Sequence, residues 1–116
     1  MDDLDQLIHQ ATRLRIMTLL HRNRQAATSW VQDALGLTPG NLASHVAKLQ
    51  AAGYVQQWMA LTPGGFESHL RITPNGAGAF STYLAALQAV LEAPAAPGDS
   101  PPVSRASAAQ KKRAQK

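Results

Sequence analysis

The stretch that most constrains the fold is the segment 36–48, where a turn leads directly into a helix start. Thr38 has a hydroxyl that can accept a hydrogen bond from an unpaired backbone N–H, and Pro39 has the fixed φ that suits the first helical position. Apolar residues then follow at i, i+4 and i+7, namely Leu42, Val46 and Leu49. Because this spacing puts them on one face, the sequence predicts a helix from Pro39 to about Ala52 with one buried side.

The opposite face of that helix is small, polar and weakly basic, and no acidic residue occurs between positions 38 and 50. It carries Gly40, Asn41, Ser44, Ala47 and Lys48. Just upstream, the segment 30–36 reads as a shorter amphipathic helix, capped by Thr28 or Ser29 and ended by Gly36. Two helices joined by a short turn form a helix-turn-helix pattern, in which the second helix can enter the DNA major groove. The same pattern also occurs where two helices meet in an ordinary bundle.

The formal net charge of +4 belongs to the end of the chain. Residues 1–93 hold six basic and six acidic side chains, so the whole excess lies in residues 94–116. This second segment is rich in Pro, Ala, Ser and Gly and has no apolar period, which predicts a disordered tail behind a single domain of residues 1–93. The tail would either add non-specific affinity for DNA or keep the protein soluble. Its basic residues are Arg105, Lys111, Lys112, Arg113 and Lys116.

Several classes of chemistry are not expected. The chain has no cysteine, no Gly-rich phosphate loop and no nucleophile motif, and its four histidines are widely spaced, so we expect no enzyme, no cofactor and no metal site. Its apolar runs are far shorter than the roughly 18 residues of a membrane span, and a cytoplasmic location is expected. Met17, Trp30 or Tyr83 could line a pocket for an apolar effector between the dimer helices, but ordinary core packing accounts for these residues better.

After Gly53 the hydrophobic period changes from helical to alternating. Segments 54–61 and 66–73 read as two strands around the turn 62–65, which predicts a β-hairpin. On the second strand one face carries Phe66, Leu70 and Ile72, and the other carries Glu67, His69 and Arg71.

Helices are expected at both ends of residues 1–93. One would begin near Asp2 or Asp3, and the other would begin at Thr73-Pro74. Because the first helical region is apolar most of the way round and the last carries a narrow apolar seam, we expect the two to form a homodimer interface, with packing inside one domain as the alternative. The residues expected there are Leu4, Leu7, Ile8, Phe80, Tyr83, Leu84, Leu87 and Leu91.

Helix, helix-turn-helix, hairpin and closing helix in this order resemble the small winged-helix transcriptional regulators of bacteria and archaea, of the ArsR/MarR-like group. The matching phrases include Arg13-Leu14-Arg15-Ile16-Met17, Gly40-Asn41-Leu42-Ala43-Ser44-His45-Val46, Ala52-Gly53-Tyr54-Val55 and Arg71-Ile72-Thr73-Pro74. The resemblance covers roughly residues 4–92. It implies an α+β, mostly α fold, a winged helix-turn-helix with terminal helices at the dimer interface. It also implies a homodimer that binds pseudo-palindromic double-stranded operator DNA, most often as a repressor.

Carried over position by position, the resemblance implies a set of DNA-binding residues. They are Thr38, Gly40, Asn41, Ser44, His45 and Lys48 on the second helix. Pro39 joins them through its place at the helix start, and His69 and Arg71 are the residues that the hairpin, called the wing in this family, offers to the DNA backbone. Chemically, Asn41 can pair with an adenine edge, Ser44 with several groups, and Lys48 with a phosphate. Pro39 and Gly40 leave the helix start open to a phosphate. His45 lies between the inner and outer faces, so contact with the DNA backbone and a packed or solvated ring both stay open.

Two features depart from the family's pattern. The wing tip 62–66 is uncharged and is followed by Glu67, where such proteins commonly carry arginines, and the second helix has one lysine and no arginine. Weak DNA binding by residues 1–93 is therefore expected unless the tail contributes. The alternative is a winged-helix protein–protein interaction module without sequence-specific DNA binding, in which the neutral hairpin and Trp58 dock a partner. RNA binding is a third possibility, with only Trp58 and Phe66 available to stack on bases.

Overall fold

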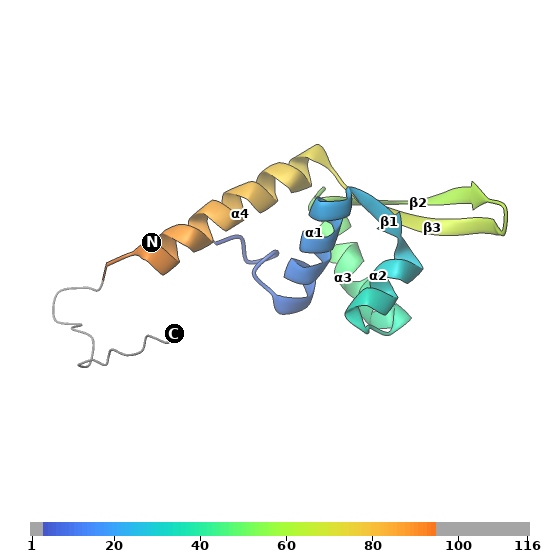
Figure 1. The fold of residues 1–116 in the computed structure, drawn as a ribbon, viewed down its shortest axis with the longest axis horizontal. Coiled ribbons are helices and arrows are strands. Elements are labelled where there is room, and N and C mark those ends of the chain that lie inside the picture. The colour runs from blue at the N-terminus through green and yellow to red at the C-terminus, as the bar shows by residue number, and fades with distance from the viewer. Residues whose placement is uncertain (1–3, 95–116) are drawn as a thin grey trace, which may run out of the picture.

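A computed structural model describes residues 4–94. The elements are α1 (Ala11–Asn23), β1 (Gln25–Ala27), α2 (Thr28–Leu35), α3 (Pro39–Ala51), β2 (Val55–Thr62), β3 (Gly65–Ile72) and α4 (Pro74–Glu92). The strands form one antiparallel sheet in the order β1-β3-β2. In Figure 1 the helices α1, α2 and α3 gather beside the base of the sheet, the β2–β3 hairpin projects to one side, and α4 runs out on the other. The predicted tail and all its basic residues lie outside the described residues.

The core lies where α1 and α3 meet the base of the hairpin. The apolar face predicted for α3 is confirmed, because Leu42, Val46 and Leu49 are all buried. They pack in one cluster with Ile16, Met17 and Leu20 of α1, Val31 of α2, and Val55 and Leu70 of the sheet. Burial of these side chains fixes which side of α3 faces inward, and therefore which side faces solvent.

Local capping explains where most helices begin. The Thr38 hydroxyl accepts a hydrogen bond from the Asn41 N–H at 3.1 Å, and Gly36 ends α2 in the left-handed conformation with φ 65°. The predicted cap of α2 is wrong: the cap position is Ala27, which makes no side-chain cap. Because β1 runs directly into α2, Thr28 is already helical, and its hydroxyl lies 2.8 Å from Ser68 Oγ on β3.

The predicted start near Asp2 or Asp3 lies outside the described residues, but residues 4–10 are not helical as predicted, since α1 begins only at Ala11 and residues 6–10 make turns and bends. A side chain accounts for the difference. Asp5 Oδ1 accepts hydrogen bonds from the N–H groups of Leu7 and Ile8, at 2.9 and 3.3 Å, which closes a tight turn in place of a helix. Gln10 then caps α1 by accepting from the Arg13 N–H at 2.8 Å.

The hairpin has two distinct faces because its register places alternate residues on opposite sides. Val55 and Leu70 point to the core, and further out the same face carries Met59, Leu61 and Phe66, which are 59%, 75% and 72% exposed. The other face carries Gln56, Trp58, His69 and Arg71. The predicted hairpin and the alternation of its second strand are confirmed.

Candidate nucleic-acid interface

The outer face of α3 is a surface of small and polar side chains that no other part of residues 4–94 covers. Thr38, Pro39, Gly40, Asn41, Ser44 and Lys48 are all exposed, as the sequence predicts. At Gly40 even an added Cβ would meet nothing within 4 Å, so the first turn of the helix is open to close approach. The positive end of the helix dipole lies at this turn and favours an anion such as a phosphate.

His45 differs from the rest of the predicted set, because it is half-buried and has a partner in its own chain. Its Nδ1 lies 3.1 Å from a guanidinium nitrogen of Arg13, and the Nε of Arg13 donates to the Leu7 carbonyl at 2.6 Å. Burial, then the charges of Arg13 and Lys48, lower the pKa of His45 below 6.5. The neutral imidazole can thus accept from Arg13 and join α3 to α1 and the N-terminal turn.

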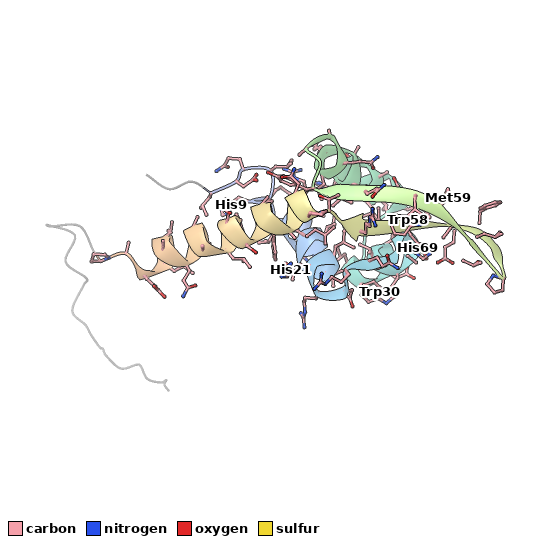
Figure 2. All side chains as sticks on the ribbon, turned by 90° about the horizontal axis from the view of Figure 1, so that it is seen from above. His9, His21, Trp30, Trp58, Met59 and His69 are labelled. Carbon is pink, nitrogen blue, oxygen red and sulfur yellow. The ribbon has the colours of Figure 1, made fainter. Side chains whose placement is uncertain are left out.

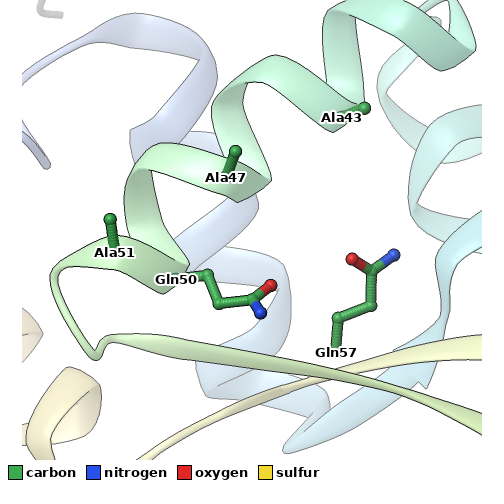
Figure 3. A pocket seen from close by; sticks show the side chains of 5 residues that line it. All are labelled: Ala43, Ala47, Gln50, Ala51 and Gln57. Carbon is green, nitrogen blue, oxygen red and sulfur yellow. The ribbon is translucent and has the colours of Figure 1, made fainter.

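A groove of about 430 Å³ runs between α3 and strand β2. Figure 3 shows the amides of Gln50 and Gln57 directed into the space between helix and strand, with three alanines along the helix above. The lining residues are Ala43, Ala47, Gln50, Ala51 and Gln57, and none of them carries a charge. The groove widens the surface of α3 toward the wing.

Sequence reasoning did not single out Ala43, Gln50 or Gln57. The helical period places the first two beside the buried face of α3, so it does not assign them to the outer face. No signal in the sequence could have found Gln57, because its position depends on how the hairpin packs against the helix. A chain of contacts holds it in place: Gln57 Nε2 donates to Ser68 Oγ at 2.9 Å, and Ser68 Oγ lies 2.8 Å from Thr28 Oγ1.

His69 and Arg71 lie on the face of the sheet opposite to buried Leu70, and thus away from α3. Figure 2 shows Trp58 and His69 together on the hairpin, and their ring centroids are 5.5 Å apart. His69 Nε2 is 3.0 Å from a Glu67 carboxylate oxygen, and Arg71 lies over the Trp58 ring and donates to Gln56. The structure therefore does not bring these two residues onto the surface of α3, and their contact with DNA stays a prediction.

The residues predicted for dimerisation fall into two groups. Ile8, Phe80 and Tyr83 are buried in the core of their own chain, and Leu4, Leu7 and Leu87 pack partly against that core. Leu84 and Leu91, by contrast, are 43% and 75% exposed on the projecting part of α4. Any interface through α4 would therefore use the second group.

Within residues 4–94, no helix is both long and apolar enough to cross a membrane. The same residues hold no group of three or more His, Asp or Glu side chains that could bind a metal ion.

The capped helix pair, the exposed second helix and the adjoining hairpin define a winged helix-turn-helix. The chain belongs to the family of winged helix DNA-binding domains, whose pattern matches residues 12–91. This match confirms the resemblance and the α+β, mostly helical fold.

Solved structures agree with this assignment. The transcriptional regulator homologue protein from Pyrococcus horikoshii OT3 is 32% identical, with a TM-score of 0.72 over 76% of this chain and 87% of that chain. YusO from Bacillus subtilis is 14% identical, with a TM-score of 0.64 over 74% of this chain and 60% of its own. A mutant MarR from E. coli, solved in complex with operator DNA, is 15% identical, with a TM-score of 0.62 over 74% of this chain and 61% of its own. The last two share the fold alone. No curated protein sequence matches the chain.

Proposed function

We propose that this protein is a homodimeric, sequence-specific DNA-binding transcriptional regulator that acts as a repressor and reads the major groove with α3. The observation that carries the proposal is the exposed, acid-free outer face of α3, held outward by buried Leu42, Val46 and Leu49 in a chain of the winged helix DNA-binding family. The P. horikoshii protein, a transcriptional regulator homologue, supports a regulatory role, and MarR shows the same fold in complex with operator DNA.

Within this proposal the residues of α3 divide by chemistry. Asn41 and Ser44 contact base edges, and Lys48 contacts a phosphate. The first turn of the helix, at Thr38 to Gly40, lies against the DNA phosphate backbone. Arg13 and His45 orient the helix, since they join it to α1. Sequence preference therefore depends mainly on Asn41, and overall affinity depends on the cations.

The homodimer is proposed to form through α4. In Figure 1 this helix extends beyond the rest of the domain, and its apolar residues Leu84, Val90 and Leu91 are 43%, 45% and 75% exposed. Two copies related by a two-fold axis would bury these residues and present two α3 helices to successive major grooves.

The basic tail residues Arg105, Lys111, Lys112, Arg113 and Lys116 are proposed to add non-specific affinity. Each phosphate neutralised contributes a slope of about −0.9 to the dependence of log affinity on log salt. Removal of residues 105–116 is expected to lower affinity on all sequences alike and to flatten this slope. Unchanged binding at low salt would show that the tail has no such role.

Selection of bound sequences from random duplex DNA with the full chain tests the main proposal. An inverted repeat is expected, and Asn41→Ala is expected to relax preference at one position by about 1–3 kcal/mol, roughly 5- to 150-fold. Transcription from a promoter that carries the selected site should fall when the protein is added. Selection without any enriched sequence would reject the proposal.

One observation favours the second candidate, a winged-helix protein-interaction module. Met59, Leu61 and Phe66 form an exposed apolar patch at the wing tip, and such patches often mark contacts between proteins. Trp58 does not belong to this patch, because it lies on the other face with His69 and Arg71. The interaction module would be supported if the full chain selects no DNA sequence and binds a partner protein that the Phe66→Ser variant no longer binds.

A further inference from the structure

The groove beside α3 is neutral, although it adjoins a surface expected to face a polyanion. Its lining consists of the side chains of three alanines and two glutamines, and Lys48 is not among them. A phosphate oxygen binds best to a cation or to several backbone N–H groups. None of the lining side chains is a cation. Methyl groups and primary amides suit instead the neutral base edges of a major groove.

The chemistry of this surface distinguishes between base pairs. Primary amides such as those of Asn41 and Gln50 form bidentate hydrogen bonds with adenine N6 and N7, and alanine methyls pack against the thymine C5-methyl group. Guanine is read mainly by arginine or lysine, and cytosine by glutamate or aspartate. Between Pro39 and Ala51 there is no arginine and no acid, and Lys48 is the one cation.

We infer that the half-site read by α3 is rich in A·T pairs, because the exposed amides and methyl groups of α3 and its groove match adenine and thymine edges. This inference rests on the proposed function and narrows its substrate class. Gln50 pairs with an adenine, and Ala43 and Ala47 contact the methyl groups of neighbouring thymines.

Gln57 assists this recognition from the wing. Its amide nitrogen is engaged by Ser68, which leaves the carbonyl oxygen as the acceptor available to the groove. An acceptor at that place suits an exocyclic amino group, either N6 of adenine or N4 of cytosine, and in the A·T-rich half-site it is adenine N6. Ser68 and Thr28 are positioning residues in this recognition, since Ser68 holds the Gln57 amide and Thr28 in turn contacts Ser68.

The first test is the composition of the selected site. Runs of A·T pairs are expected at the positions where Gln50→Ala changes the preference. An enriched inverted repeat with G·C pairs at those positions would overturn the inference and leave the proposed function intact. A selection without enrichment would reject the proposed function, and the inference would fall with it.

The second test removes single methyl groups from the DNA. Replacing a contacted thymine by uracil in the selected duplex is expected to weaken binding about fourfold, the transfer free energy of roughly one methyl group. The same replacement outside the site is the control and should have no effect. Equal affinity for both duplexes would contradict the alanine–thymine contacts.

The third test exchanges the base preference. Gln50→Glu keeps the size of the side chain but leaves only acceptors, so cytosine should replace adenine at the contacted position. Gln6→Glu in the N-terminal turn is the matched control, because Gln6 is exposed and lies outside both the groove and α4. An unchanged selected site with Gln50→Glu would overturn the assignment of Gln50. Ser68→Ala should broaden the preference at the Gln57 position while the free energy of unfolding changes little.

Discussion

At Gly76, helix α4 packs directly against the backbone of Tyr54. A Cβ at this position would clash with the Tyr54 carbonyl group and lie 2.8 Å from its carbon, whereas a Cβ at Gly78 would meet nothing within 4 Å. Gly76→Ala is therefore expected to lower the free energy of unfolding by about 1–3 kcal/mol, because the backbone must shift. Gly78→Ala, in the same helix, should raise it by about 0.5–1 kcal/mol. Urea denaturation measures both, and a change of the same sign in the two variants would contradict the close packing.

His45 gives the stability a dependence on pH. The unfolded chain binds a proton on this ring near pH 6.5, and the folded chain does so only at lower pH, because burial and the charges of Arg13 and Lys48 lower the pKa. The contribution of His45 is thus fully present above pH 6.5 and is lost as the pH falls through the folded-state pKa. His45→Gln should lose less stability than the parent between pH 7 and pH 5. Denaturation profiles that run parallel over this range would show that His45 makes no such contribution.

At the scale of elements, the N-terminal turn of residues 5–10 is not helical, but it makes hydrogen bonds to several other parts of the domain. Asp5 caps the turn and also accepts a 2.5 Å hydrogen bond from the Tyr54 hydroxyl, which raises the pKa of Tyr54 to about 12. His9 lies 2.7 Å from the hydroxyl of buried Tyr83, and Arg13 donates to the Leu7 carbonyl. The turn therefore connects α1, α4 and the start of the wing.

Tyr54→Phe removes one of these connections without leaving a cavity. The expected loss is about 1.5 kcal/mol, at the low end for a hydrogen bond to a charged group because the pair is half exposed. Backbone amides of residues 6–10 should exchange hydrogen faster, whereas those of α3 should not. Unchanged exchange of the turn would mean that the bond to Asp5 does not hold it.

The wing is an element whose two faces have different roles. Its base completes the core, its outer face pairs Trp58 with His69 and Arg71, and its tip is apolar. The wing tip has no arginine. This agrees with an interface in which α3 and its groove determine the sequence preference, and Lys48 and the basic tail provide most of the affinity.

At the scale of the whole molecule, the proposed regulator depends on two copies. Leu84→Glu with Leu91→Glu places charges on the exposed apolar side of α4 and should weaken self-association on the order of 100-fold, since roughly 3 kcal/mol of apolar burial is lost. Sedimentation at several concentrations measures this. The control is Ala85→Glu with Ala89→Glu, exposed residues on the opposite side of the same helix. Identical sedimentation of the two variants would contradict a dimer through this face.

Much of this fold could be predicted because it is encoded locally. The spacing of Leu42, Val46 and Leu49, the Thr-Pro starts at 38 and 73, and the change to alternation after Gly53 each act within a few residues, and the structure confirms the elements they predict. The start of α1 could not be predicted in this way. Residues 2–10 have an apolar pattern that a helix would also satisfy, and only the bonds of Asp5 to the turn and to distant Tyr54 favour the turn.

The sequence by itself thus determined the helix-turn-helix, the hairpin and the exposed side of α3, since period and capping are properties of neighbouring residues. The tertiary structure decided which residues share a surface. It joined His45 to Arg13, turned His69 and Arg71 away from α3, and brought Gln57 to the groove opposite Gln50. These outcomes depend on strand register and on packing between elements far apart in the chain, which no local pattern specifies.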